Sequence, residues 1–262
     1  MKSVFQENEW RNNRHFLNPS KFKEYELHAV GIGLLNKINP LKDFFEKFTP
    51  LDELSEDELL KLNKKTTLYL IRKEISTEET QLLEKNKFKL TKEWATLILD
   101  LTKPLNIDKG NMSLVKKGMQ NLTFSQLSTI EELKEYHELF KNVRKSEGMK
   151  TPRFEEYQKV FNNKYYKVFV AKNKQGKIVA GIGTIANNEY ALQLNIARDK
   201  DYKYASDYLT FMIVEGMIRN GLKLFDFAGI NPKPEQDSKD YFIRKYKEKW
   251  GGEYYNEYTY TR

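Results

Sequence analysis

The chain has 262 residues, of which 39% are hydrophobic and 13% aromatic, and this is the composition of a globular protein rather than a disordered one. It contains no cysteine, which excludes disulfides, thiolate metal sites and a cysteine nucleophile. The formal net charge of +8 favours partners that carry negative charge, such as nucleic acid, nucleotide diphosphates or anionic lipid headgroups. The length allows one large domain or two small ones, each with its own core.

The sequence has no apolar stretch long enough to span a membrane, and its first ten residues are polar and lack the apolar core of a signal peptide. We therefore expect a cytoplasmic protein that would reach a membrane-bound substrate from the surface. The positive charge is concentrated in residues 141–177, which hold eleven Lys and Arg residues against three Glu residues. A polyanion-binding surface and an ordinary solvated surface would both account for this concentration.

The first half of the chain predicts alternating strands and helices. We expect strands over residues 24–34 and 67–71, the second of which is apolar and buried. An acidic helix over 51–62 begins after Pro50, and a helix over 76–85 begins with a capping box from Ser76 to Glu79. A further strand over 94–101 ends before Pro104.

The second half has a clearer order of elements. Apolar residues at spacings of three and four predict helices over 130–147 and 153–161. A three-stranded meander follows, and then a helix that Gly221 closes, a buried strand, a basic helix and a last strand. The expected ranges are 166–171, 178–186 and 190–197 for the meander, then 204–220, 222–227, 239–250 and 254–260. This order resembles that of a GNAT acyltransferase lobe.

Five short segments carry a more specific resemblance. In chain order they are 5–10 (FQENEW) with Arg14, 70–72 (LIR), 96–101 (TLILDL), 224–229 (LFDFAG) and 243–251 (IRKYKEKWG). They resemble motifs of the Fem family (FemABX-like) of peptidoglycan-bridge aminoacyltransferases, which are double versions of the GNAT fold. The resemblance implies an α+β fold with a mixed sheet and two GNAT-like lobes, a reduced one over 1–104 and an acyltransferase lobe over 105–262.

The expected donor follows from a loop that this chain lacks. Simple GNAT enzymes hold the CoA pyrophosphate on the backbone N–H groups of a glycine-containing loop that begins a helix. The matching residues 198–205 (RDKDYKYA) contain no glycine. Fem proteins also lack this loop and use aminoacyl-tRNA. We therefore expect no bound cofactor and aminoacyl-tRNA as co-substrate, with acyl-CoA as the alternative donor.

The resemblance also points to a catalytic residue. Lys247 follows Tyr246 in the segment similar to the family's Phe-Lys pair, where the lysine lies by the substrate's phosphates and the reacting acyl group. A lysine ammonium suits a diphosphate or a developing oxyanion. The alternative is a surface lysine on a basic helix that also carries Lys245 and Lys249.

Other candidates would bind the substrate. Arg153 and Tyr157 are four residues apart and share a helix face, and the resemblance implies that they bind a nucleotide-linked or lipid-linked diphosphate. Arg14 would meet the same phosphates from the first lobe, and Tyr190 would line the cleft or belong to the core. Asp226 would act as a base or, in the interpretation that we favour, hold its turn through a backbone hydrogen bond.

Several kinds of site are not expected. The three histidines have no metal-ligand spacing, so we expect no metal and no Ser-His-Asp triad. Gly181 and Gly183 lie inside an expected meander strand and do not begin a helix, so they are not a dinucleotide fingerprint. The sequence says nothing about the oligomeric state.

The function that the resemblance implies is amide formation between an activated acyl group and an amine on a nucleotide- or lipid-linked cell-envelope precursor, such as a sugar or muropeptide. One alternative is an acyl-CoA-dependent N-acyltransferase that acts on a nucleotide-activated amino sugar for surface polysaccharide. Another is a non-catalytic RNA-binding module, for which the basic residues 141–177 and the aromatic residues Tyr165, Tyr166 and Phe169 would provide the surface.

Overall fold

A computed structural model of the chain describes residues 46–48, 55–61, 66–161, 165–186 and 189–262. The expected strand over 24–34, the opening motif at 5–10 and the candidate Arg14 lie outside these ranges. Within them the chain is a mixture of helices with strands in both parallel and antiparallel pairs, which confirms the expected α+β class.

The described residues divide into two compact units. The first unit comprises those of Met1–Leu97 together with Gly229–Arg244 and Glu253–Arg262, and the second comprises Ile98–Ala228 and Lys245–Gly252. The units are therefore not two consecutive stretches of sequence. The division of the chain into lobes at residue 104 stays a prediction.

The first unit contains a sheet with two helices. Its strands have the order β1, β2, β9 and β3, in which β1 and β2 are parallel and β2 and β9 are antiparallel. The bounds are β1 (Glu46–Phe48), α2 (Glu56–Lys61), β2 (Thr66–Arg72), α3 (Thr77–Lys85), β3 (Lys89–Asp100) and β9 (Glu253–Thr261). The side chain of Ser76 accepts a hydrogen bond from the backbone N–H of Glu79 and so caps α3, which is the Ser76 half of the predicted capping box.

A cluster of buried side chains from these elements forms the core of the first unit. Its members are Leu59, Leu68, Leu70, Leu83, Phe88, Tyr258 and Tyr260. Tyr258 and Tyr260 lie in β9, close to the end of the chain, and are paired with Leu70 and Leu68 of β2. The hydrophobic core of this unit therefore depends on contacts between distant parts of the sequence.

The second unit is built around the strands β8, β7, β6, β5 and β4 in that order. The pairs from β4 to β7 are antiparallel, and β7 and β8 are parallel. The strands are β4 (Thr123–Gln126), β5 (Tyr166–Lys172), β6 (Ile178–Ala186), β7 (Tyr190–Arg198) and β8 (Leu224–Ile230). The helices are α4 (Lys109–Asn121), α5 (Ile130–Ser146), α6 (Phe154–Phe161) and α7 (Ala205–Arg219). Of α8 (Lys239–Glu248), the residues from Lys245 onward belong to this unit and the earlier ones to the first unit.

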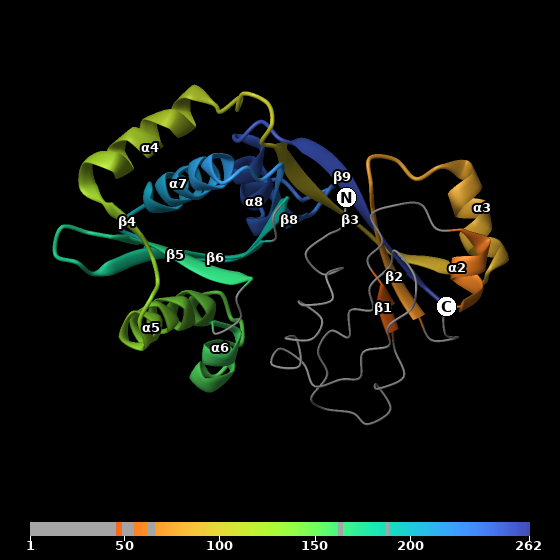
Figure 1. The fold of residues 1–262 in the computed structure, drawn as a ribbon, viewed down its shortest axis with the longest axis horizontal. Helices are drawn as coiled ribbons and strands as arrows, with labels where there is room; N and C mark the ends of the chain where they lie inside the picture. Colours follow the sequence, from red (N-terminus) through yellow and green to blue (C-terminus); the bar gives the residue numbers. More distant parts are fainter. Residues whose placement is uncertain (1–45, 49–54, 62–65, 162–164, 187–188) are drawn as a thin grey trace. The chain divides into compact units, whose positions relative to one another are not determined.

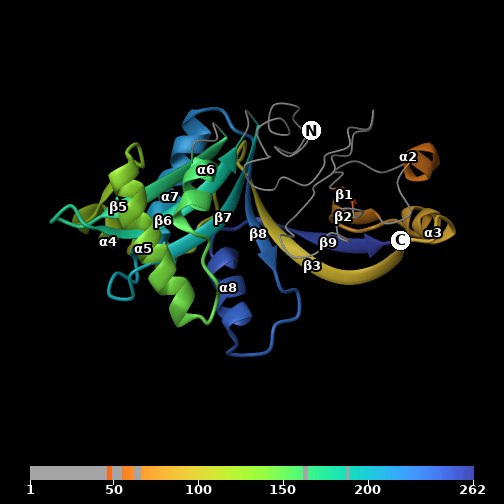
Figure 2. The ribbon, with the colours of Figure 1, turned by 90° about the horizontal axis from the view of Figure 1, so that it is seen from below.

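Helices cover both faces of this second sheet. Figure 1 shows α4 and α7 on one face and α5 and α6 on the other. Figure 2 shows the same strands from the side on which α5 and α6 lie in front. Gly118 of α4 leaves no room for a Cβ, which would come within 2.3 Å of the Tyr208 side chain on α7. This glycine therefore allows α4 and α7 to approach each other closely.

The parallel pair β7–β8 separates along its length. Residues 190–192 pair with 224–226, and this pairing ends at Leu192 and Asp226 although both strands continue. The register of the pair covers only these three residues of each strand. The carboxylate of Asp226 therefore lies where the two strands begin to part.

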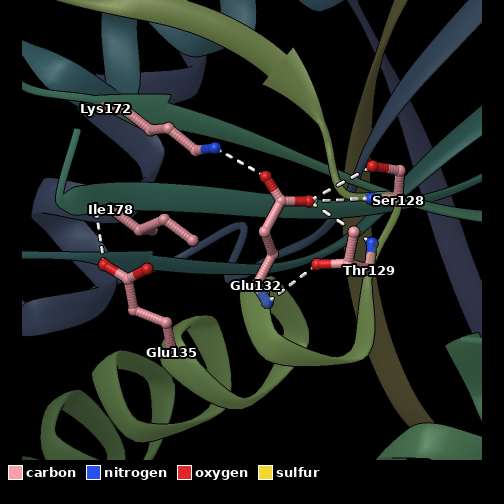
Figure 3. Close-up of polar contacts among 6 residues, drawn as sticks. All are labelled: Ser128, Thr129, Glu132, Glu135, Lys172 and Ile178. Atoms are coloured by element: carbon pink, nitrogen blue, oxygen red, sulfur yellow. Dashed lines mark hydrogen bonds and ion pairs between the residues drawn. The ribbon is translucent and has the colours of Figure 1, made fainter.

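The first two turns of α5 are tied by polar contacts to the sheet of the second unit (Figure 3). Glu132 accepts a hydrogen bond from Lys172 Nζ of β5 at 2.6 Å and completes a capping box with Thr129. Glu135 accepts one from the backbone N–H of Ile178 at 2.7 Å. Two carboxylates of one helix therefore fix it to two neighbouring strands.

We expect Glu132→Gln to lower the free energy of unfolding by about 1–3 kcal/mol at pH 7, because a charge-assisted hydrogen bond is lost. The Lys172 ammonium lowers the pKa of Glu132 from 4.5 to about 2. The stabilisation is therefore present above pH 4.5 and disappears as the pH falls towards 2. Urea unfolding across this range tests it, with Glu138→Gln, from the exposed pair Glu138–Lys141, as the matched control that should change little.

Candidate functional site

Three polar side chains that the sequence singles out come together in the second unit. Tyr190 begins β7, Asp226 lies in β8, and Lys247 lies in the last turn of α8. Their exposed fractions are 4%, 2% and 6%, respectively. Burial of an ionised side chain is costly without polar partners, so the hydrogen bonds of these three residues determine their charge and orientation.

These side chains are joined by a chain of hydrogen bonds through the backbone of Ala228. The Tyr190 hydroxyl donates to one carboxylate oxygen of Asp226. The other oxygen accepts from the Ala228 N–H at 2.6 Å, and the Ala228 carbonyl accepts from Lys247 Nζ at 3.0 Å. Ala228 has a φ of 60°, a left-handed conformation that disfavours a residue with a side chain. Asp226 therefore holds its own turn through a backbone hydrogen bond, which is the role that we favoured. It is also connected to Lys247 by two successive hydrogen bonds through Ala228.

Lys247 is electrostatically unusual. Burial lowers its pKa from 10.5 to about 8, and the nearby Asp226 carboxylate partly opposes this shift. At neutral pH the side chain is therefore mainly an ammonium, and its neutral form is accessible at slightly higher pH. Such a group can stabilise a developing oxyanion or exchange a proton with a reacting group.

Tyr246, the expected catalytic neighbour of Lys247, contacts a different element. Its hydroxyl lies 2.8 Å from Thr210 Oγ1 of α7 and 3.4 Å from the Ser206 carbonyl. Burial raises its pKa above the usual value of 10.0. Trp250 is fully buried and packs against Phe227, with 6.1 Å between ring centroids. These aromatic contacts hold the end of α8, so that Lys247 lies against β8.

Arg153 and Tyr157 have separate partners. Tyr157 is buried, and its hydroxyl lies 2.7 Å from the Tyr166 hydroxyl and accepts from Asn195 Nδ2 at 2.9 Å. The side chain of Arg153 is 75% exposed and pairs with Glu156 at 3.3 Å. The structure thus brings Tyr190, Asp226 and Lys247 together, whereas the side chains of Arg153 and Tyr157 contact different partners although the Tyr157 N–H donates to the Arg153 carbonyl at 3.1 Å. Their diphosphate-binding role stays a prediction.

Two residues of the site were not identified from the sequence. Ala228 has a left-handed backbone conformation, which an alanine in the sequence does not reveal. Asn195 also bonds the backbone N–H of Gly183 at 3.0 Å, beside a β-bulge between Gly183 and Thr184. No sequence pattern points to Asn195.

The beginning of α7 carries a buried carboxylate. Asp207 lies in the first turn and is 4% exposed, and among the described residues its Oδ1 atom has no hydrogen-bond partner. Burial raises its pKa from 3.8 to about 6, while the charges of Lys249 and Arg198 oppose the shift. A carboxylate at this position disfavours a phosphate at the helix N-terminus, where backbone N–H groups would otherwise attract one.

We expect Asp207→Asn to stabilise the protein at pH 8 by about 1–3 kcal/mol and to leave its stability at pH 4 almost unchanged. Since the folded-state pKa is raised, the folded protein binds more protons than the unfolded chain between about pH 4 and 6. Wild-type stability therefore falls as the pH rises through this window, and the asparagine variant lacks that decrease. Urea unfolding at pH 4, 6 and 8 measures the difference, and equal pH dependence of the two proteins would contradict the assignment.

Two features of the described residues bear on metal binding and on membrane insertion. No group of three or more His, Asp and Glu side chains is placed to hold a metal ion there. In the same part of the chain, no helix combines the length and apolar character needed to cross a membrane.

The arrangement of elements is shared with solved structures. FemX is similar to this chain with a TM-score of 0.69 and 13% identity, over 97% of this chain and 92% of that one. L-PGS from Bacillus licheniformis has a TM-score of 0.63 and 13% identity, over 99% and 92% of the two chains. The C-terminal domain of a protein described as a lysylphosphatidylglycerol synthetase, from Agrobacterium fabrum, has a TM-score of 0.64 and 13% identity, over 89% and 79%. No family model and no curated protein matches the sequence. The resemblance expected from the sequence is confirmed at the level of the fold.

Proposed function

We propose that the chain is an acyltransferase that forms an amide between an acyl group from aminoacyl-tRNA and an amine on a nucleotide- or lipid-linked cell-envelope precursor. The observation that carries the proposal is the buried Lys247, held against the Ala228 carbonyl where β7 and β8 separate. The fold shared with FemX across almost the whole chain supports the proposal. The five short segments that resemble Fem motifs support it as well.

The chemistry requires stabilisation of charge and orientation of two substrates. The acceptor amine attacks the carbonyl carbon of the aminoacyl ester, a C–N bond forms, and the carbonyl oxygen becomes an oxyanion. The ester C–O bond then breaks, and the leaving hydroxyl takes a proton that the amine has lost. The Lys247 ammonium stabilises the oxyanion in a site with little water, where such an interaction is strong. No covalent bond to the protein is required.

Two observations favour aminoacyl-tRNA over acyl-CoA as the donor. Residues 198–205 contain no glycine that would let a backbone loop surround a pyrophosphate. The buried carboxylate of Asp207 in the first turn of α7 makes this position electrostatically unfavourable for phosphates. The name of the Agrobacterium fabrum neighbour, a lysylphosphatidylglycerol synthetase, motivates a lipid-linked acceptor alongside a nucleotide-linked one.

A thermal-shift panel tests the choice of substrates, because a ligand that binds only the folded state raises the melting temperature. The panel contains uncharged tRNA, acetyl-CoA, UDP-linked amino sugars and muropeptides, and vesicles with an anionic lipid. Stabilisation by tRNA and by an acceptor, without an effect of acetyl-CoA, is expected. Stabilisation by acetyl-CoA alone would favour the acyl-CoA-dependent alternative. Binding of RNA without any acyl transfer would favour the RNA-binding module.

A further inference from the structure

We propose that Tyr190 and Asp226 are positioning residues that fix the Ala228 carbonyl and, through it, the ammonium of Lys247. The inference rests on the proposed function and assigns the two side chains a part in it. It follows from three contacts that connect β7, β8 and α8 within the second unit.

The first contact keeps the peptide after Phe227 in an unfavourable conformation. A φ of 60° at Ala228 costs roughly 1–2 kcal/mol, because the Cβ atom approaches the following carbonyl. Asp226 accepts the N–H of Ala228, two residues further on, as aspartate side chains do in Asx turns. The carboxylate therefore holds the turn in the orientation that directs the Ala228 carbonyl towards α8.

The second contact fixes the carboxylate itself. Asp226 is paired with Leu192 in the parallel register, and Tyr190 is the residue two before Leu192 on the same face of β7. Tyr190 is thus a diagonal neighbour that can reach Asp226, and its hydroxyl donates to the carboxylate oxygen that does not bind Ala228. Both oxygens are held, so the carboxylate has one orientation.

The third contact transfers this order to Lys247. Its Nζ atom donates to the Ala228 carbonyl, and the Asp226 carboxylate is the charge that favours the ammonium form against burial. The charge of Asp226, from β8, acts on the ammonium, and Tyr190 from β7 contacts that carboxylate. The adjacent Tyr246 on α8 directs its hydroxyl to α7 instead. Asp226 therefore determines both where the ammonium lies and how readily it loses its proton.

The test separates charge from geometry. In Asp226→Asn the amide oxygen can still accept from Ala228, but the negative charge is gone. We expect the Lys247 titration midpoint, followed by NMR of the ¹⁵N-labelled lysine side chains, to fall below its wild-type value. The alkaline limb of the kcat profile should move to lower pH by the same amount. Tyr190→Phe should lower kcat by about tenfold with little change in KM, because orientation rather than binding is lost.

Two further variants serve as controls. Tyr208→Phe removes the hydroxyl of another buried tyrosine of the second unit and should leave both readouts unchanged. Ala228→Gly removes the strain at φ 60°. In the Tyr190→Phe background it should restore part of kcat without moving the titration midpoint of Lys247.

An unchanged midpoint in Asp226→Asn, or wild-type kcat in Tyr190→Phe, would overturn the inference while the proposed function stands. A protein without transfer activity whose Lys247 midpoint still falls in Asp226→Asn would instead support the positioning of Lys247 and contradict the proposed function. The NMR measurement therefore distinguishes the two failures.

Discussion

Replacement of Lys247 by methionine is expected to lower acyl transfer by about 10²–10³-fold while leaving the fold at least as stable as wild type. The ammonium is 6% exposed, and burial lowers its pKa from 10.5 to about 8. Below pH 8 the folded protein therefore bears the cost of a buried charge, which methionine of similar length avoids. Between about pH 8 and 10.5 the unfolded chain binds more protons, so wild-type stability rises with pH there, and the variant lacks this rise.

Lys245→Met is the matched control for this experiment, because Lys245 lies on the same helix, is exposed and pairs with Glu248 at 3.3 Å. Its transfer rate and melting temperature should remain close to those of wild type. Steady-state transfer kinetics and urea unfolding at pH 7 and 9 measure both effects. A Lys247→Met protein with wild-type turnover, or one that fails to fold, would contradict the account of this residue.

Gly181→Ala is expected to lower the free energy of unfolding by at least about 2 kcal/mol, because the added methyl group has no space in the core. A Cβ atom there would come within 2.2 Å of Cε2 of the Tyr136 ring, which is fully buried. Neither β6 nor the ring can move without disturbing the packing of α5 on the sheet. The measurement is the urea midpoint with an unchanged m-value.

Gly216→Ala is the control with the opposite sign, because a Cβ atom there meets nothing within 4 Å in the interior of α7. It should stabilise the protein by up to about 1 kcal/mol through helix propensity. Adding Tyr136→Ala to Gly181→Ala should cost less than the sum of the two single changes, since the clash disappears. Additive losses would contradict a steric origin.

The two glycines of β6, Gly181 and Gly183, show what a sequence pattern does not predict. Their position inside a meander strand excludes a dinucleotide fingerprint, and the structure places them in β6 as expected. Each position requires a glycine because a neighbouring side chain occupies the space that a Cβ atom would need. This neighbour is Tyr136 at Gly181, and at Gly183 the neighbours are Asn195 and Tyr166. Such contacts depend on how α5 and β7 pack on β6, which local periodicity does not describe.

Most elements of the second half follow from local pattern, because their apolar residues repeat with the period of the structure that they adopt. The expected helix over 130–147 is α5 (Ile130–Ser146), and the meander strands match within one residue. Neither α4 nor β4 is predicted by the pattern of the sequence. Asp108 caps α4, but the buried residues of this helix are Asn111, Val115 and Gly118, of which only Val115 has an apolar side chain, so its apolar signal is weak. The four residues of β4 are too few to show a period.

The predicted start of one strand was also wrong, because the residues at that end have no buried face. The expected strand over 94–101 is β3 (Lys89–Asp100), whose first five residues are exposed on both faces. Exposed residues carry no alternation of polar and apolar side chains, so backbone pairing alone extends the strand. The pairing of β9 with β2 joins residues near positions 67 and 261, and no local feature predicts it.

The candidate site was recognised in parts. Resemblance and residue chemistry selected Lys247, Asp226 and Tyr190 one at a time. Their connection requires the parallel register of β7 and β8 and the left-handed turn at Ala228. Both features belong to the folded chain, since an alanine in a sequence gives no sign of a positive φ.

The most direct test of the central claim is a single-turnover assay with radiolabelled aminoacyl-tRNA and the acceptor that gives the largest thermal shift. The account predicts an amide-linked product with wild type and Lys245→Met, and a rate at least about a hundredfold lower with Lys247→Met. Equal rates in all three proteins, or no amide from aminoacyl-tRNA with any nucleotide- or lipid-linked amine, would contradict it.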